Sequence, residues 1–304
     1  MRSNFEKKRM LITGGQGLIG TYLSKKLLLK GYEVSILSRS AHNLQDISSY
    51  TWDTIEGNLH NFDAIVHLAG ASIAARWTAK NKRIIAESRI KTCELLYKLV
   101  NQLDQKPHTF ISASAVGFYG AQTSDRVMTE SNEPGIDFLG TVCNEWEIAT
   151  NKFKDLGLRT VSLRTGVVLS ENGDAMRKLG GSIKFGLGAA FGTGKQYFPW
   201  IHIEDLCAMY IQAIEDSKMQ GAYNAVAPEF ITNKEFVAAF SKVLKKPYWL
   251  PNVPSFMLRS LLGEMSILLL EGSKISTEKI EATGFTYKYP QVEEALADLL
   301  LKNR

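Results

Sequence analysis

Short apolar runs alternate with stretches of helical periodicity along the first two thirds of the chain. The run MLIT begins at Met10 and leads into a glycine turn, after which residues 18–27 place apolar side chains at helical spacing until Gly31. The apolar segment YEVSILSR follows at once. A strand, a helix and a second strand within about 30 residues predict a βαβ unit with parallel strands.

The same alternation continues to residue 227. Further strands are predicted at 63–70, 108–116, 158–169 and 221–227, helices at 85–103 and 139–155, and a strand-to-helix transition at 201–216. Strands separated by helices in this way are typical of an α/β protein with a Rossmann-type, doubly wound parallel sheet.

After Leu169 the pattern changes. Residues 173–196 are rich in glycine and predict loops with at most a short helix. From Ile231 the chain is helical and interrupted by prolines, which predicts a smaller, mostly α unit. The expected domains are a nucleotide-binding domain of residues 1–165 and 202–227 and a substrate domain of residues 166–201 and 228–304.

Composition and charge exclude several other classes of protein. The chain of 304 residues is 45% hydrophobic and carries a net charge of +5 with its basic residues scattered, so no nucleic-acid-binding surface is expected. The longest apolar run, MSILLL at 265–270, is far shorter than the ~20 residues that span a bilayer, and the start of the chain lacks a signal peptide's apolar region. Cys93, Cys143 and Cys207 stand far apart, which predicts no metal site and a reducing, cytoplasmic location.

The segment TGGQGLIG at 13–20 places glycines at 14, 17 and 20 between the first strand and its helix. Small residues there permit a tight turn, close approach of a pyrophosphate and close packing of helix on sheet, and the helix N-terminus offers free N–H donors. A plain glycine turn is the alternative. The position at the first turn of a βαβ unit favours a dinucleotide site.

The second strand indicates which dinucleotide binds. It ends Ser38-Arg39-Ser40 with no acidic residue nearby, whereas an NAD site usually has an acid there for the ribose 2′-hydroxyl. A guanidinium suits the 2′-phosphate of NADP, so NADP (NADPH) is the expected cofactor. The alternative is that Arg39 is a solvated surface charge.

Several segments resemble the extended, epimerase-type short-chain dehydrogenase/reductase family. They are TGGQGLIG at 13–20, HLAG at 67–70, FISASAVGFYG at 110–120 and WIHIEDL at 200–206. An atypical branch of that family, the sugar-nucleotide epimerases with their own C-terminal domain, is similar also at RWT (76–78), SRI (88–90), EWE (145–147), LRTGVVLS (163–170) and the tail from Pro251. The resemblance covers nearly the whole chain.

The resemblance implies chemistry by a Tyr-x-x-x-Lys pair, in which the tyrosine is the general acid/base and the lysine lowers its pKa and holds the nicotinamide ribose. If Glu147 matches the glutamate that often follows this motif, the two positions are Leu139 and Cys143, and a shift of one residue gives Phe138 and Val142. The only Y-x-x-x-K, Tyr22 to Lys26, lies in the helix after the phosphate loop and is interpreted as packing. The family's proton-transfer pair is therefore absent.

Three residues are candidates for the remaining catalytic roles. Ser114 falls at the family's serine position, and the asparagine position is Ser88. Tyr119 could present a phenol near the nicotinamide, or serve only as a structural aromatic. Cys143 could act as a weak acid/base if its pKa were depressed, although a cysteine on a helix that faces a sheet is commonly a small buried hydrophobe.

Substrate contacts are expected from Arg76, Trp77, Arg164 and Trp200, which lie near the ligand-binding ends of the strands, with burial as the alternative for the tryptophans. His202 and Asp205 are interpreted as structural. The cofactor contacts expected from the motifs and the resemblance are Thr13, Gly14, Gly17, Leu18, Ile19, Gly20, Ser38, Arg39, Leu68, Ala69, Gly70, Arg89 and Ser112.

Together these patterns predict an NADP-binding, epimerase-like oxidoreductase or isomerase that acts on a nucleotide-sugar or a similar anionic metabolite. The rival is a non-catalytic NADP-binding or redox-sensing protein, which the missing tyrosine and lysine favour. A homodimer is the expected assembly, with neither a nucleic acid nor a membrane as partner.

Overall fold

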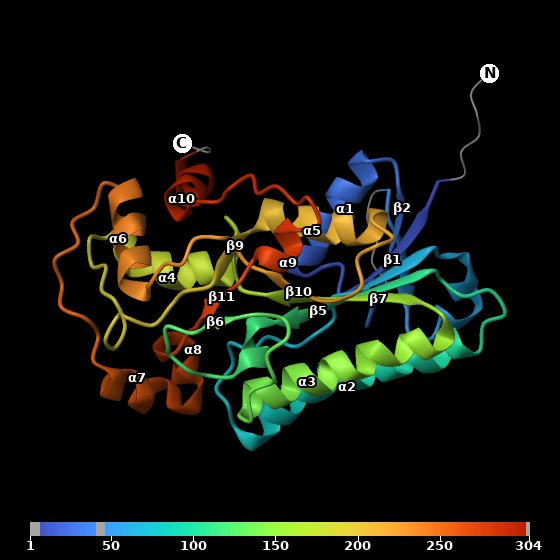
Figure 1. Cartoon of the computed structure of the whole chain (residues 1–304), viewed down its shortest axis with the longest axis horizontal. Coiled ribbons are helices and arrows are strands. Elements are labelled where there is room, and N and C mark those ends of the chain that lie inside the picture. The colour runs from blue at the N-terminus through green and yellow to red at the C-terminus, as the bar shows by residue number, and fades with distance from the viewer. Residues whose placement is uncertain (1–6, 41–45, 302–304) are drawn as a thin grey trace.

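A seven-stranded sheet forms the centre of the molecule in a computed structural model that describes residues 7–40 and 46–301 (Figure 1). All of its strands run parallel, in the order β10-β7-β5-β4-β1-β2-β3. The strands are β1 Arg9–Thr13, β2 Glu33–Ser38, β3 Ser48–Thr51, β4 Ala64–His67, β5 Thr109–Ala115, β7 Arg159–Thr165 and β10 Gly221–Ala225. The predicted doubly wound parallel sheet is confirmed, and its strand order reverses between β1 and β4.

Two helices cover each face of the sheet. Figure 1 shows α1 (Leu18–Leu29) and α5 (Ile203–Glu215) on one face and α2 (Ala79–Asn101) and α3 (Phe138–Asn151) on the other. Side chains of β1 alternate between the two faces, as the pleat requires. Ile12 packs with Leu23 and Leu206 on the first face, whereas Leu11 packs with Leu96 on the second.

The remaining elements either pack around the sheet or form a second group beside it. They are the 3-10 turns η1 Glu56–Asn61, η2 Val116–Tyr119, η3 Lys152–Leu156 and η4 Gly263–Ser266, the strands β6 Val127–Met128, β8 Val167–Leu169, β9 Trp200–His202 and β11 Lys274–Ile275, and the helices α4 Asp174–Lys184, α6 Asn233–Val243, α7 Ser255–Leu262, α8 Ile267–Leu270, α9 Glu278–Glu281 and α10 Val292–Leu301. A separate apolar cluster joins Trp200 to Phe236, Phe240 and Leu296. The domain boundaries expected from the sequence stay a prediction.

The strand predicted at 158–169 is wrong in one respect, because it is two strands in different sheets. The chain turns at Gly166, where an added Cβ would lie 2.5 Å from the carbonyl oxygen of Pro199. β7 therefore stays in the central sheet, and β8 pairs with β9 in parallel.

The glycine-rich stretch holds more helix than expected. α4 runs for 11 residues through Gly180, where an added Cβ would lie 2.6 Å from the ring of Phe240. This glycine is therefore a packing residue and not a turn. The helix predicted at 139–155 becomes α3 followed by η3, and β3 was not predicted at all. No helix in the described part of the chain is both long enough and apolar enough to span a membrane.

Candidate functional site

The turn between β1 and α1 is closed by backbone contacts that leave no room for side chains. Gly14 has φ +67°, and a Cβ there would lie 2.9 Å from the backbone of Leu68 and Ala69. A Cβ at Gly20 would lie 2.5 Å from Cα of Gly15. α1 begins at Leu18 with Gly17 as its N-cap, so the N–H groups of its first turn have no acceptor within the helix. This cradle fits a phosphate group.

Thr13 ties this turn to the loop after β4. Its Oγ1 accepts from the N–H groups of Leu68 and Ala69, both at 3.2 Å, and lies 2.8 Å from Nδ1 of His67. His67 is fully buried, and burial lowers its pKa to about 4, so the ring is neutral near pH 7 and its Nδ1 can accept the threonine proton. The buried side chain of Thr13 thus holds the loop after β4 next to the phosphate turn.

The end of β2 is open to solvent. Arg39 is exposed, and Ser38 donates from its hydroxyl to the carbonyl oxygen of Ser40. Leu68, Ala69 and Gly70 follow β4 on the other side of β1 and are partly or fully exposed. Both edges of the phosphate cradle are therefore accessible.

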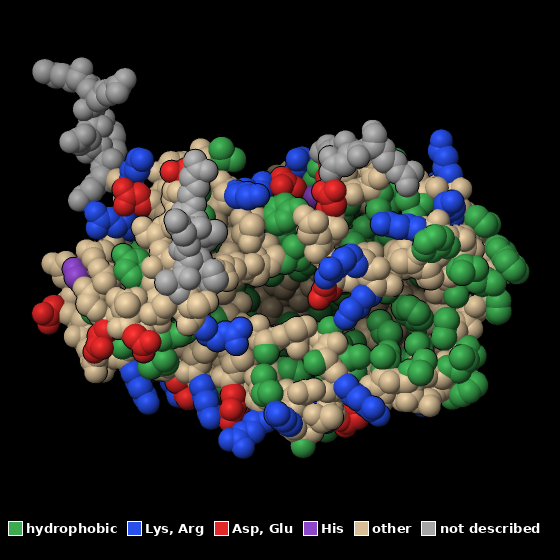
Figure 2. Space-filling view, turned by 180° about the vertical axis from the view of Figure 1, so that it is seen from behind, with side chains coloured by type: hydrophobic (Ala, Val, Ile, Leu, Met, Phe, Trp, Pro, Cys, Tyr) green, Lys and Arg blue, Asp and Glu red, His purple; other side chains and the backbone are tan. Residues whose placement is uncertain are grey.

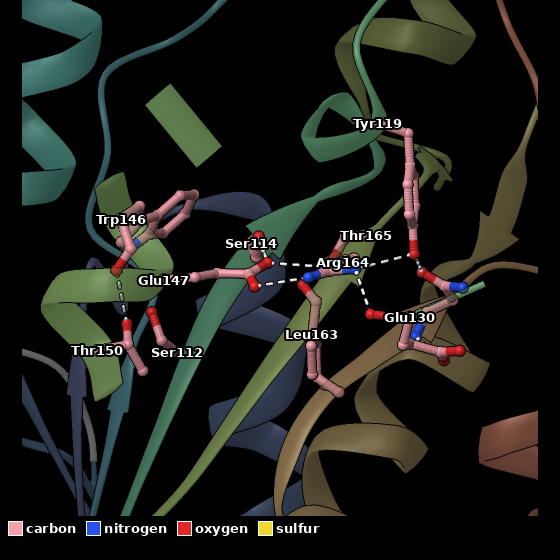
Figure 3. Close-up of polar contacts among 12 residues, drawn as sticks. Ser112, Ser114, Tyr119, Glu130, Trp146, Glu147, Thr150, Leu163, Arg164 and Thr165 are labelled. Atoms are coloured by element: carbon pink, nitrogen blue, oxygen red, sulfur yellow. Dashed lines mark hydrogen bonds and ion pairs between the residues drawn. The ribbon is translucent and has the colours of Figure 1, made fainter. Parts of the chain in front are cut away.

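A buried polar network lies at the carboxyl ends of β5 and β7 (Figure 3). Arg164 donates from Nε and Nη2 to the two carboxylate oxygens of Glu147, at 2.8 and 2.9 Å, and from Nη1 to the hydroxyl of Tyr119 at 3.1 Å. Ser114 donates to Glu147 at 2.6 Å. Tyr119 donates to Oδ1 of Asn224, also at 2.6 Å. The guanidinium lies 3.4 Å from the centre of the Phe118 ring.

This network gives two of the expected catalytic residues structural partners. Tyr119 is buried, which raises the pKa of its phenol, and its proton already points to Asn224. Ser114 is likewise buried, and its hydroxyl donates a hydrogen bond to Glu147. Neither hydroxyl is poised to exchange a proton with a ligand in this arrangement.

The positions that the family gives to tyrosine and lysine hold apolar or buried side chains. Cys143 is buried, and this burial raises the pKa of its thiol to about 12, opposite to the depression that acid/base chemistry would need. Leu139 instead lines a cleft beside the sheet.

That cleft, of about 410 Å³, lies between the first turn of α3 and the C-terminal helices. Its lining is mainly apolar, with Trp77, Phe138, Leu139, Ile267 and Leu270. Charged groups also reach it, among them Arg259 and the ion pair of Lys82 with Glu264. Figure 2 shows one face of the molecule, hollowed near its middle, with apolar side chains gathered at the end that carries α6 and α7.

The four expected substrate contacts separate into two groups. Trp77 lines the cleft, where its ring packs edge-on against Phe138, and Arg76 beside it is exposed. Trp200 is fully buried in the second apolar cluster, and Arg164 is held by Glu147. The expectation for Trp200 and Arg164 is therefore corrected, because neither side chain faces open space.

Three more residues with expected roles lie on α2 and β5. Ser88 accepts from the N–H of Ala71 and so holds the loop after β4. Ser112 is buried and donates to the carbonyl oxygen of Ala113. Arg89 lies against Gly70, with a Cβ there only 3.1 Å from its Cζ atom.

His202 and Asp205 are structural, as expected. His202 caps α5 by accepting from the N–H of Glu204. Asp205 accepts from the N–H groups of Lys288 and Tyr289 and so binds the C-terminal tail. Tyr22 packs against the core and Lys26 pairs with Glu204, in line with the packing interpretation of that Y-x-x-x-K.

Glu147 and Asn224 make buried polar contacts that the sequence did not predict. A signal for the contact of Glu147 existed, because Arg164 lies in a strand of the predicted parallel sheet, where both faces are buried, and a buried charge is usually paired. Nothing local to residues 221–227 indicates the contact of Asn224 with Tyr119. Within residues 7–40 and 46–301 no cluster of His, Cys, Asp and Glu is arranged to hold a metal ion.

Comparison with family models gives two matches. The NAD dependent epimerase/dehydratase family matches residues 10–225, and a domain of unknown function, DUF1731, matches residues 253–299. Epimerase family protein YfhF of Bacillus subtilis is 36% identical over 295 residues, which cover 95% of this chain and 97% of that protein.

Solved structures agree with these matches. Human epimerase family protein SDR39U1 (isoform 2), crystallised with NADPH, has a TM-score of 0.88 at 33% identity and covers 97% of this chain and 99% of that one. UDP-N-acetylglucosamine 4-epimerase from Bacillus cereus has a TM-score of 0.77 at 19% identity, covering 96% and 98%, which is a likeness in fold alone. By its phosphate-loop fold and by these matches, the chain belongs to the NAD-dependent epimerase/dehydratase family and carries a DUF1731 domain.

Proposed function

We propose that the chain binds NADP(H) at the carboxyl end of β1 and acts on a small molecule held in the neighbouring cleft. The observation that carries the proposal is the glycine turn before α1, where the backbone closes so tightly at Gly14 and Gly20 that any side chain would collide with it, and where the first N–H groups of the helix have no acceptor within the helix. Arg39 stands exposed at the end of β2, and the sequence has no acidic residue between positions 34 and 45 that would suit a ribose 2′-hydroxyl instead. The crystallisation of human SDR39U1 with NADPH supports the same cofactor.

Each part of the site has a separate task in this proposal. The free N–H groups at the start of α1 bind the diphosphate, and the guanidinium of Arg39 pairs with the 2′-phosphate. The bound cofactor supplies a hydride donor or acceptor. Trp77 and Leu139 offer the substrate an apolar wall. Arg259 brings a positive charge for a nucleotide-sugar or a related anionic metabolite, in a lining that also holds the carboxylates of Asp137 and Glu271.

A non-catalytic role is the second candidate, and one observation favours it. Ser114, Tyr119 and Cys143, the three expected proton carriers, are all buried, and the two hydroxyls donate within the protein. An NADP(H)-binding or redox-sensing protein needs the cradle but no proton carrier.

Stereospecific hydride exchange distinguishes the two functions. The chain would be incubated with NADPH deuterated at one face of nicotinamide C4 and with a panel of anionic carbonyl compounds that includes keto-nucleotide-sugars, because only a carbonyl carbon can accept the hydride. Transfer of the label to a substrate supports the enzyme. Tight NADPH binding without any transfer across the panel would favour the binding protein.

Arg39 gives a direct test of the cofactor assignment. Replacement by alanine removes the charge that pairs with the 2′-phosphate, so we expect about ten-fold or greater loss of NADPH affinity with little change for NADH. Isothermal titration calorimetry measures both, and Lys25→Ala, on the exposed side of α1, is a matched control. Equal losses for NADPH and NADH would refute the assignment.

The homodimer and the cytoplasmic location remain predictions.

A further inference from the structure

Arg89 lies on α2 with its guanidinium at the carboxyl end of β4. The group lies so close over Gly70 that a Cβ at that residue would be 3.1 Å from Cζ and 3.4 Å from Nε. On its other side Cζ is 5.3 Å from the centre of the Trp146 ring on α3. The guanidinium is thus wedged between the loop after β4 and α3.

The charge of Arg89 is not balanced by any carboxylate within ion-pair distance among the described residues. Nη1 donates to the carbonyl oxygen of Ile85, a neutral acceptor on the same helix. Partial burial lowers the pKa of the guanidinium. Arg164, by contrast, is paired with Glu147. Arg89 is half-buried, and a cation that loses part of its hydration without a counter-charge is costly, so this arrangement favours a role toward a ligand.

The position of Arg89 relative to the sheet shows which part of a ligand it would meet. Arg39 follows β2 on one side of β1, whereas Arg89 lies beside β4 on the other. A dinucleotide in a doubly wound sheet crosses the point where the strand order reverses, which here separates these two arginines. With the adenosine half assigned to the side of Arg39, the nicotinamide half falls on the side of Arg89.

Cys143 lies near Arg89. In the register that Glu147 would set, Cys143 takes the position of the family's lysine that holds the nicotinamide ribose. The positive charge missing from α3 is therefore present nearby, but it comes from α2.

We propose that Arg89 replaces the missing lysine as the positioning residue that donates hydrogen bonds to the hydroxyls of the nicotinamide ribose. This assignment rests on the proposed binding of NADP(H). A guanidinium offers several donors in a fixed plane, which suits two adjacent hydroxyl groups. Its charge also lies beside the nicotinamide ring, which is cationic in NADP⁺ and neutral in NADPH, so it favours binding of the reduced form.

Calorimetric titration of Arg89→Met with four ligands tests the proposal. The ligands are NADPH, NADP⁺, NADH and adenosine 2′,5′-bisphosphate, which lacks the nicotinamide ribose. We expect about ten-fold weaker binding of NADPH and NADH, less than about two-fold change for the bisphosphate, and a reduced preference for NADPH over NADP⁺. Arg39→Ala should show the opposite selectivity, with loss of NADPH and bisphosphate but not of NADH.

Two further variants separate a ligand contact from a packing role. Arg89→Lys keeps the charge and should recover most of the preference for NADPH over NADP⁺. Arg83→Met removes an exposed arginine of the same helix that pairs with Glu87, and it should leave all four affinities unchanged. Unfolding midpoints of each variant confirm that the titrated protein is folded.

Several results would overturn the assignment. Unchanged NADPH affinity in a folded Arg89→Met variant would by itself refute the assignment. An equal loss of affinity for NADPH and for the bisphosphate would also refute it, because the effect would then lie outside the nicotinamide half. Failure of Arg89→Lys to recover the preference for the reduced form would leave only a packing role. Absence of NADPH binding by the unmodified chain would instead overturn the proposed function itself.

Discussion

Arg164 carries a full positive charge into the interior of β7, where only a carboxylate can balance it. Glu147 provides that carboxylate from α3 through two hydrogen bonds. The remaining donors and acceptors of the pair then hold Ser114 and Tyr119. At this scale, one buried charge fixes the hydrogen bonds of both hydroxyls, Ser114 and Tyr119, that the sequence made candidates for the chemistry.

His67 is a second buried residue whose ionisation affects the whole fold. Burial lowers its pKa from 6.5 to about 4 in the native state. Below pH 6.5 this histidine therefore binds a proton in the unfolded chain but not in the native state. The free energy of unfolding thus falls as the pH drops from 6.5 towards 4. The loss should total roughly 3 kcal/mol.

Urea unfolding across that pH range measures this contribution. We expect His67→Gln to show a shallower loss of stability with falling pH than the unmodified chain, while His108→Gln, at an exposed histidine, keeps the original slope. An unchanged slope in His67→Gln would assign the acid sensitivity to other groups.

The sequence predicted the role of a single residue only where that role depends on neighbours close along the chain. The glycines of the phosphate loop are such a case, because the turn itself demands them. Trp200 and Tyr119 are not, since their surroundings come from segments far along the chain, such as Phe236 and Asn224. From the sequence alone, an aromatic residue in a ligand site therefore cannot be told from one in the core.

At the scale of elements, the contact of α1 with β1 depends on Gly20. An added Cβ would lie 2.5 Å from Cα of Gly15 and 2.7 Å from the carbonyl oxygen of Gly14, and backbone atoms cannot yield as a flexible side chain would. We expect Gly20→Ala to lower the free energy of unfolding by about 1–3 kcal/mol and to abolish measurable NADPH binding.

Gly181 is the matched control for this substitution. It lies in α4 with no atom within 4 Å of an added Cβ, so Gly181→Ala should stabilise the protein by roughly 0.5–1 kcal/mol through helix propensity. Chemical unfolding and calorimetry give both quantities. Full stability and full NADPH affinity in Gly20→Ala would contradict the close packing of α1.

The pattern of elements was predicted well where apolar residues have a clear period. β3 was missed because Ser48, Ser49 and Thr51 surround a single apolar ring, and its pairing depends on β2. α4 was underestimated because its glycines were interpreted as turns. Gly180 is required by the ring of Phe240, a contact that only the tertiary structure reveals.

At the scale of the whole molecule, Asp205 fastens the C-terminal tail to the sheet unit. Its buried carboxylate accepts from the N–H groups of Lys288 and Tyr289, which precede α10. Asp205→Ala leaves both donors without that acceptor, so we expect a loss of about 2–3 kcal/mol in the free energy of unfolding.

Hydrogen exchange can locate this effect. Amides of residues 287–301 should exchange faster in Asp205→Ala, while those of β1 and β4 keep their relative protection. Asp53→Ala, at an exposed aspartate, is the control. Uniformly faster exchange throughout the molecule would mean that Asp205 supports the global fold and not the attachment of the tail.

The sequence predicted the cofactor end of the site better than the substrate end. The phosphate loop is one continuous segment, whereas the cleft joins Trp77 and Leu139 to Ile267 and Leu270, which are more than a hundred residues away along the chain. No local pattern could indicate that these four side chains meet.

The buried thiols have a practical consequence. Cys93, Cys143 and Cys207 are each buried, and burial raises the pKa of each to about 12, so alkylating reagents should not modify them in the native state. They lie on α2, α3 and α5 respectively, and thus on both faces of the sheet. The protein carries three natural reporters, and the order in which they become labelled would show which layer opens first.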